Sequence, residues 1–147
     1  MDWQQEYNDK RISTDQAVEQ IIDINNLILG MSMAMPPGLL EALGRGFRED
    51  RLPPLNIYYM HGSEAIEKHL LVEDLIGKFT PRCLFLSGHD RKAGKELSNK
   101  HWMEFVPASF HHVGRLLTEH IEPDCFMVCP SGLNPFIGGN GGVYRHG

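Results

Sequence analysis

Residues 27–40 contain the pattern best suited to chemistry: an apolar run, a glycine, a loop of small and flexible residues, and a proline pair. This order predicts a strand, a loop and a helix, because Pro37 lacks the N–H that has no partner in a first helical turn. Gly30 is expected to let the backbone leave the strand in a conformation closed to other residues. Loops of this kind expose backbone amides beside a helix N-terminus, where open α/β sheets bind anionic ligands. A plain strand-to-helix connection has the same pattern, so both interpretations stay open.

Three of the seven methionines, Met31, Met33 and Met35, alternate with small residues along this loop. Their flexible thioether side chains suit the wall of a pocket for an apolar acyl group. The same side chains are more often gap fillers in a core, which is the alternative interpretation.

The histidines and cysteines offer two further kinds of chemistry. His111 and His112 are adjacent, and neighbouring helical side chains point about 100° apart, so the two cannot bind one ion from a regular turn. We therefore predict no metal site. Cys125 and Cys129 lack the paired partners of a zinc ribbon and are typical of small core residues. A Cys–His nucleophile pair stays open, because one sequence does not tell which residues are close in space.

The elements that must position the loop follow from hydrophobic periodicity. Short apolar runs predict strands at residues 27–29, 55–60, 83–86, 103–106 and 125–128. Apolar residues at helical spacing predict helices that begin near Ser13, Pro37, Ser63 and Ser109, and Ser13 and Gln16 have the spacing of a capping box. Because strands alternate with helices, we expect an α/β domain with a mainly parallel sheet and helices on both faces.

Other stretches are expected to contribute little chemistry. Residues 1–10 suit a short helix that lays Trp3 and Tyr7 against the body of the domain. Gly44 and Gly46 are expected to weaken the helix that begins at Pro37 by about 1 kcal/mol each relative to alanine. Residues 89–100 are charged and lack an apolar period, which predicts a solvated helix or loop.

Composition limits the class of protein. A chain of 147 residues, 41% of them hydrophobic, fits one globular domain, and the formal net charge of −5 argues against a nucleic-acid partner. Three cysteines without disulfide spacing indicate a reducing cytoplasm. No apolar span approaches the roughly 20 residues of a membrane helix. Residues 131–147 hold six glycines without periodicity, so we expect a domain over residues 1–130 and a glycine-rich, disordered tail over residues 131–147.

Several segments, in a fixed order, carry a resemblance to a known family. They are Trp3, Tyr7 and Lys10, the capped helix of residues 13–22, residues 27–30, Pro36, residues 39–43, residues 107–117 and residues 123–128. Together they resemble the N-terminal domain of the acetyl-CoA hydrolase/transferase family, of the 4-hydroxybutyrate CoA-transferase type. The resemblance covers Met1 to about Pro130.

The resemblance implies the N-terminal domain of a class I CoA-transferase-like protein, which moves CoA between carboxylic acids or hydrolyses acyl-CoA. In such enzymes two similar α/β domains enclose the active site, and a glutamate forms an acyl anhydride and then an enzyme–CoA thioester. That glutamate and most CoA-binding glycine motifs lie in the second domain. This chain therefore has no predicted catalytic residue and no cofactor, and coenzyme A enters as the substrate thioester.

The resemblance also implies that residues 30–36 face the cleft between the domains, with loop amides polarising the thioester oxygen. The predicted substrate-binding residues are Gly30, Met31, Ser32, Met33, Met35, His112 and Arg115. The last two are helix-surface residues, which are usually solvated. The expected partners are an acyl-CoA, a small carboxylic acid, and a missing C-terminal domain or a second copy of the chain, with no nucleic acid and no membrane.

The family pattern breaks near residue 130, which suggests a truncated or frame-shifted reading frame and a chain that is inactive alone. Two alternatives belong to other classes. One is a small module that binds an anionic metabolite without turnover. The other is a non-catalytic subunit that pairs with a separately encoded second domain.

Overall fold

The structure is a computed structural model and describes residues 2–97, 102–129 and 142–145. One sheet has the strand order β4-β3-β2-β1-β5-β6. All neighbours from β4 to β5 are parallel, and β6 pairs antiparallel with β5. The strands are β1 (Asn26–Leu29), β2 (Asn56–Tyr59), β3 (Thr80–Cys83), β4 (Glu104–Phe105), β5 (Cys125–Val128) and β6 (Gly142–Arg145). The expected α/β class with a mainly parallel sheet is confirmed.

Strand β6 departs from the sequence analysis, which predicts no strand after residue 130. Its backbone pairs along the whole of β5, from Val128 with Gly142 to Cys125 with Arg145. Its pairing with β5 uses backbone hydrogen bonds, which residues of most types can form. The strand therefore needs no alternation of apolar residues to cover the open edge of the sheet. Residues 131–141 and 146–147 of the expected tail lie outside the described residues.

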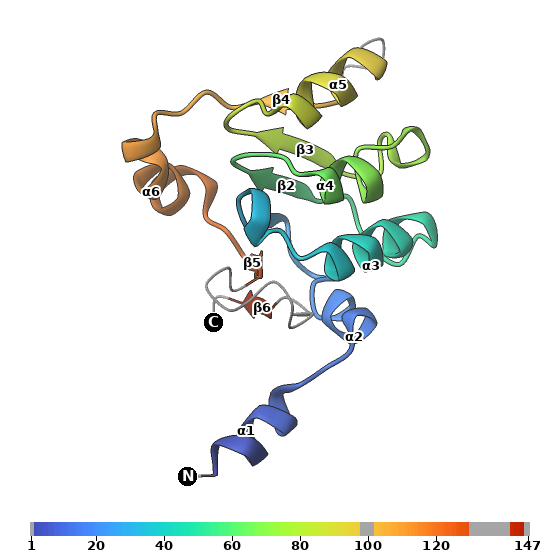
Figure 1. Ribbon diagram of the computed structural model, residues 1–147, viewed down its shortest axis with the longest axis vertical. Coiled ribbons are helices and arrows are strands. Elements are labelled where there is room, and N and C mark those ends of the chain that lie inside the picture. Colours follow the sequence, from blue (N-terminus) through green and yellow to red (C-terminus); the bar gives the residue numbers. More distant parts are fainter. Residues whose placement is uncertain (1, 98–101, 130–141, 146–147) are drawn as a thin grey trace.

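Helices cover both faces of the sheet, as expected, but unequally (Figure 1). Helices α2, α3, α4 and α5 lie on one face, and α6 lies on the other. The helices are α1 (Trp3–Lys10), α2 (Thr14–Glu19), α3 (Pro37–Arg48), α4 (Glu64–His69), α5 (Gly88–Glu96) and α6 (Val113–Leu116), with short turns η1 (Ser32–Ala34), η2 (Glu73–Leu75), η4 (Phe110–His112) and η5 (Leu117–Ile121).

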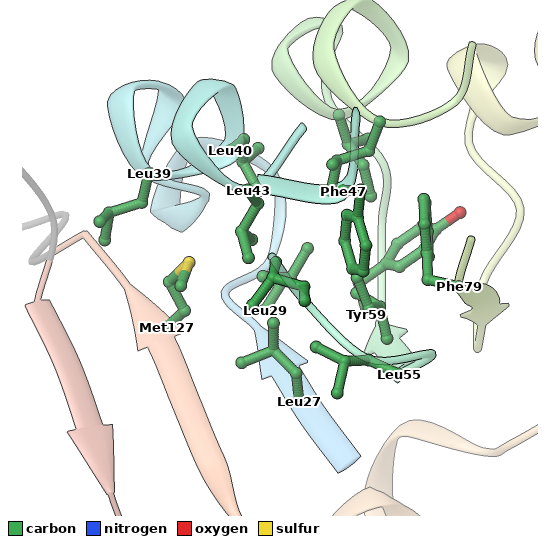
Figure 2. Packing of buried hydrophobic residues seen from close by; sticks show 14 of the residues in the cluster. Leu27, Leu29, Leu39, Leu40, Leu43, Phe47, Leu55, Tyr59, Phe79 and Met127 are labelled. Carbon is green, nitrogen blue, oxygen red and sulfur yellow. The ribbon is translucent and has the colours of Figure 1, made fainter. Parts of the chain in front are cut away.

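The larger core lies between α3 and the centre of the sheet (Figure 2). Leu39, Leu40, Leu43 and Phe47 repeat at helical spacing along α3 and are buried. Phe47 stacks on Phe79, with 4.9 Å between the ring centroids. This packing holds the start of α3, and with it the loop that precedes α3, against the end of β1.

The smaller core, on the other face, joins Ile28, Tyr58 and Leu84 to Val113 and Ile121 from the segment of α6. The sequence predicts one regular helix from Ser109 to about Ile121. The structure instead has the 3-10 turn η4, a single α-helical turn and the π-helical turn η5. The apolar spacing is therefore kept while the backbone hydrogen-bond pattern changes twice.

Strand β3 is displaced from the predicted residues 83–86 to Thr80–Cys83, although it contains Pro81. A proline lacks the N–H of a strand ladder and is confined to unpaired positions. The N–H of Thr80 donates to the backbone oxygen of Leu55, the residue before β2, so the nitrogen of the next residue, Pro81, faces the other side of β3. There β4 pairs only with Arg82 and Cys83, so no ladder bond is lost.

Helix α1 also differs from the expectation. Trp3 and Tyr7 are exposed and no residue of α1 is buried. In Figure 1 the helix extends away from the sheet. By contrast, the capping box of Ser13 and Gln16 at the start of α2 is confirmed, with both reciprocal hydrogen bonds present.

The glycines of α3 are packing residues rather than weak points. A Cβ at Gly44 would lie 2.4 Å from the backbone oxygen of His69 in α4, so α3 and α4 approach each other closely there. Gly44→Ala is therefore expected to lower the free energy of unfolding by about 2 kcal/mol. Gly94→Ala in α5, where a Cβ meets nothing within 4 Å, is the control and is expected to raise it by about 0.5–1 kcal/mol. Urea unfolding measures both, and equal stabilisation by the two variants would contradict the close contact.

Candidate functional site

The loop after β1 lies at the carboxyl end of the sheet, at the point where the strand order reverses. The chain moves from β1 to β2, β3 and β4 in one direction and then returns to β5 on the other side of β1. Open α/β sheets bind ligands at such a switch point. Here Gly30 N–H donates to Met127 O at 3.0 Å, and Cys129 N–H donates to Ala34 O at 2.7 Å. The loop is therefore hydrogen-bonded at one end to β5 and at the other to Cys129, the residue after β5.

Gly30 is needed for space rather than for its backbone angles. Its φ is not in the left-handed region, contrary to the expectation of a conformation closed to other residues. A Cβ at this position would lie 2.3 Å from Ala34 O and 2.7 Å from Ala34 C, both backbone atoms. The loop thus folds back onto the α-carbon of Gly30.

Backbone amides of the loop are available to a ligand. Among the residues that the structure describes, the N–H groups of Met31 and Met33 have no hydrogen-bond partner. Ser32 between them has φ +47°. This left-handed conformation is unfavourable for a residue with a side chain, and residues strained in this way cluster at functional sites. Two neighbouring free donors can stabilise an oxyanion.

The three loop methionines separate in the structure. Met33 and Met31 are exposed, at 81% and 41%. Met35 is buried in the larger core, and its sulfur accepts a hydrogen bond from the hydroxyl of Ser63 at 3.1 Å. Core filling therefore describes Met35, whereas Met31 and Met33 stay beside the free amides.

The loop after β2 supports the loop after β1. Ser32 N–H donates to His61 O at 3.1 Å, and the bond from Ser63 to Met35 adds a second link. Ser63 is the expected N-cap residue of α4, but its hydroxyl makes no capping bond. Its hydroxyl is used between the loops instead.

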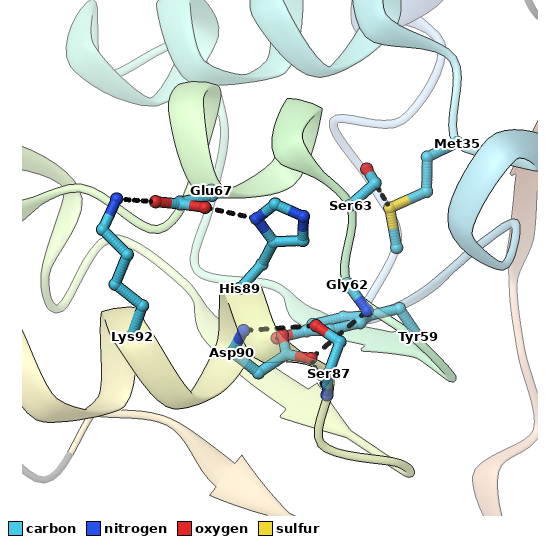
Figure 3. Close-up of polar contacts among 9 residues, drawn as sticks. All are labelled: Met35, Tyr59, Gly62, Ser63, Glu67, Ser87, His89, Asp90 and Lys92. Atoms are coloured by element: carbon cyan, nitrogen blue, oxygen red, sulfur yellow. Dashed lines mark hydrogen bonds and ion pairs between the residues drawn. The ribbon is translucent and has the colours of Figure 1, made fainter.

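Asp90 links this pair of loops to a third (Figure 3). Its carboxylate is 1% exposed and accepts bonds from the Tyr59 hydroxyl (3.0 Å), Ser87 N–H (2.7 Å) and Gly62 N–H (3.3 Å). Burial, and then the charge of Asp90, raises the pKa of Tyr59 and keeps its hydroxyl a donor. Hydrogen bonds thus connect the loop after β1 to the loop after β2, and the loop after β2 to the loop after β3.

Asp90 was not predicted as a site residue, because residues 89–100 are charged and lack an apolar period, which is typical of a solvated stretch. A signal was present, since Ser87 and Asp90 have the spacing of a capping box, and the structure forms it at the start of α5. What the spacing does not reveal is that the same carboxylate reaches Tyr59 and Gly62 on β2 and its loop.

The buried thiol of Cys83 is not an activated nucleophile. Cys83 and Cys125 are buried and Cys129 is half-buried. Burial, and then the nearby Asp90, raises the pKa of the Cys83 thiol to about 12, which disfavours the reactive thiolate. Within residues 2–97, 102–129 and 142–145, no cluster of histidine, cysteine and carboxylate side chains could hold a metal ion.

His112 and Arg115, the other predicted site residues, lie on η4 and α6, on the opposite face from α3. Both are exposed, and Arg115 forms an ion pair with Glu119 at 2.6 Å, one helical turn away. Among the described side chains, no hydrogen bond, ion pair or ring contact joins either of them to residues 30–35. Their part in substrate binding stays a prediction.

An open hollow of about 660 Å³ lies elsewhere, between α4 and α5. Glu67 in it accepts hydrogen bonds from Lys92 and from His89, and these partners hold its pKa below the usual range. The carboxylate is thus already paired, and the hollow does not include the loop after β1.

Comparison with known proteins shows a likeness to solved structures of RipA. No protein-family model matches the chain, and no curated protein does. The crystal structure of RipA from Yersinia pestis superposes with a TM-score of 0.80 and 30% sequence identity over 88% of this chain. A RipA variant with one methionine changed to glycine gives a TM-score of 0.82 at 27% identity over 88% of the chain.

The likeness is to part of RipA only, because this chain spans about 31% of its length. The likeness shows a shared α/β fold over nearly all of the present chain. In the part of the chain that the structure describes, no helix has the length and apolar content needed to cross a membrane.

Proposed function

We propose that the chain supplies the N-terminal α/β domain of an acyl-CoA:carboxylate CoA-transferase or acyl-CoA hydrolase that acts in the cytoplasm. Its substrates are a CoA thioester and a small carboxylic acid, with acetate and 4-hydroxybutyrate as the acids that the family resemblance suggests. The nucleophilic glutamate and most CoA contacts belong to a second domain or another subunit. No residue of this chain acts as the nucleophile.

The observation that carries the proposal is the loop after β1, with two free amides beside a strained Ser32 at the switch point of the sheet. The sequence resemblance to the acetyl-CoA hydrolase/transferase family supports the assignment of a thioester to this loop. The fold shared with part of a longer protein, RipA, supports a chain that works together with further structure.

In this reaction the chain binds and orients the thioester substrate. Attack of the glutamate carboxylate on the thioester carbonyl carbon breaks the C–S bond, giving an acyl-glutamyl anhydride and the CoA thiolate. Negative charge develops on the carbonyl oxygen during this attack, and the N–H groups of Met31 and Met33 stabilise it. Met31 and Met33 side chains flank the acyl group, and Asp90 keeps the supporting loops in place.

A CoA-exchange assay tests the proposal. The chain is mixed with acetyl-CoA and a deuterated carboxylic acid, with or without a co-expressed polypeptide that carries the family's nucleophilic glutamate and CoA-binding glycine segments. Mass spectrometry is expected to detect labelled acyl-CoA only in the complemented sample. Rapid exchange by the chain alone, or none after complementation, would contradict the proposal. Saturable CoA binding that still gives no exchange after complementation would instead support the non-catalytic alternatives.

A further inference from the structure

Helix α1 exposes two aromatic side chains on one of its faces. Trp3 is 71% exposed and Tyr7 is 63% exposed, and no residue of the helix is buried. The two residues are four positions apart, so their side chains lie one turn apart on the same face. The helix itself extends away from the sheet (Figure 1). We refer to Trp3 and Tyr7 as the aromatic stripe of α1.

The contacts within α1 are local and weak. The side chain of Asp2 caps the helix by accepting from Gln4 N–H at 3.1 Å, and Lys10 forms an exposed ion pair with Glu6 at 2.6 Å. Isolated helices shorter than about 12 residues are marginal in water, and helices in proteins are stabilised mainly by packing of an apolar face. Helix α1 has eight residues and no buried side chain. Its sequence therefore suits a helix whose apolar face is covered by another surface.

The size of the aromatic stripe limits what that surface belongs to. Tryptophan and tyrosine bury about 150–250 Å² each, so the stripe can remove about 300–500 Å² of this chain's surface from water. A stable interface between separate proteins buries about 800 Å² on each partner. The stripe alone is thus too small to hold a separate protein. Its partner must also contact this chain elsewhere.

The second domain of the proposed enzyme meets this requirement. This chain spans about 31% of the length of RipA, so RipA has further polypeptide beside the shared part. In the proposed function, a second domain encloses the cleft at the loop after β1 and already contacts this chain there. Resting on that function, we infer that the aromatic stripe of α1 docks into an apolar groove of the second domain. Contacts linked in this way strengthen binding although each is small by itself.

Alanine variants of the stripe test the inference. The binding partner is the complementing polypeptide of the exchange assay, purified and titrated in a calorimeter; we call it the second-domain polypeptide. Trp3→Ala and Tyr7→Ala are each expected to weaken its affinity about tenfold, because buried tryptophan and tyrosine side chains dominate binding energies at interfaces. Equal affinities of these variants and the control would overturn the inference.

Gln5→Ala is the matched control. Gln5 is exposed in α1, but at 100° per residue it lies about 200° around the helix from Trp3. This variant is expected to change the affinity by less than about twofold. Because α1 buries no residue, all three variants should unfold at the same urea concentration as the unaltered chain. A weaker affinity that merely followed a loss of stability would overturn the assignment to the stripe.

The two tryptophans of the chain locate the contact. Trp102 is already buried, and its Nε1 donates to Phe79 O at 2.7 Å, so only Trp3 can pass from water into a groove. Fluorotryptophan is incorporated into this chain only, and ¹⁹F NMR follows the titration. The Trp3 resonance, assigned by its absence in Trp3→Phe, is expected to move on binding, whereas the Trp102 resonance stays. A Trp3 resonance that did not move at saturation would overturn the inference.

Sedimentation of the chain alone tests the other occupant, a second copy. We expect the unaltered chain and Trp3→Ala to be monomers. A dimer that Trp3→Ala abolishes would show that a second copy covers the stripe, and the inference would be wrong.

The same experiments separate the inference from the function on which it rests. If complementation yields CoA exchange but the stripe variants bind like Gln5→Ala, the proposed function stands and the docking of α1 is wrong. If the second-domain polypeptide binds through the stripe without CoA exchange, the stripe stands as an interface and the transferase assignment fails. No association of the unaltered chain with the second-domain polypeptide would overturn both.

Discussion

Gly30→Ala is expected to lower the free energy of unfolding by about 3 kcal/mol. The added Cβ would lie 2.3 Å from the backbone oxygen of Ala34, and that oxygen cannot move without losing its bond to Cys129 N–H. Relief of the clash therefore requires the whole loop to lift from β5. Because this movement also displaces the amides of Met31 and Met33, acyl-CoA binding is expected to disappear at temperatures where the variant is still folded.

Chemical denaturation followed by tryptophan fluorescence measures the loss of stability. Gly114→Ala is the control, because a Cβ at Gly114 in α6 meets nothing within 4 Å and alanine is the better helix former. The control should be unchanged or slightly stabilised and should keep its ligand affinity. A Gly30→Ala variant as stable as the control would refute the folded-back geometry of the loop.

Asp90→Ala is expected to cost about 3–5 kcal/mol of unfolding free energy. The substitution leaves the donors of Tyr59, Gly62 and Ser87 without their acceptor in a buried place. It also releases Gly62, the neighbour of His61, whose carbonyl holds Ser32 in the candidate site. Loss of stability should therefore be accompanied by faster amide exchange at Ser32.

Asp90→Asn separates charge from shape. The amide keeps the size of the carboxylate and one accepting oxygen, but its NH₂ group faces a donor, so we expect a smaller loss of about 2 kcal/mol. Urea unfolding and hydrogen–deuterium exchange measure both effects. If Asp90→Ala were no less stable than Asp90→Asn, the three hydrogen bonds would not hold the loops together.

Local patterns in the sequence were sufficient for the main elements of the fold. The period of Leu39, Leu40, Leu43 and Phe47 predicts α3, and the spacing of Ser13 and Gln16 predicts the start of α2, because neighbours within one helix determine both. The displacement of β3 had another cause. Pro81 is tolerated only because β4 is too short to pair with it, and strand length is a property of the assembled sheet.

The candidate site was predicted less completely, for a related reason. The position of the loop after β1 follows from the strand–loop–helix order, but the burial of Met35 and the exposure of Met33 depend on how α3 closes over β1. The hydrogen bonds that Asp90 accepts from Tyr59 and Gly62 join residues more than 20 positions apart. No periodicity within one segment reports such contacts.

The role of the loop amides is tested most directly by the ¹³C resonance of the thioester carbonyl in [1-¹³C]acetyl-CoA bound to the chain. Met31 has φ −85°, which proline can adopt, so Met31→Pro removes one amide donor, and Met31→Leu is the control that keeps it. We predict a downfield shift on binding to the unaltered chain and to Met31→Leu, and a clearly smaller shift with Met31→Pro. An identical shift in all three proteins, or no shift in any, would contradict a thioester held by the loop after β1.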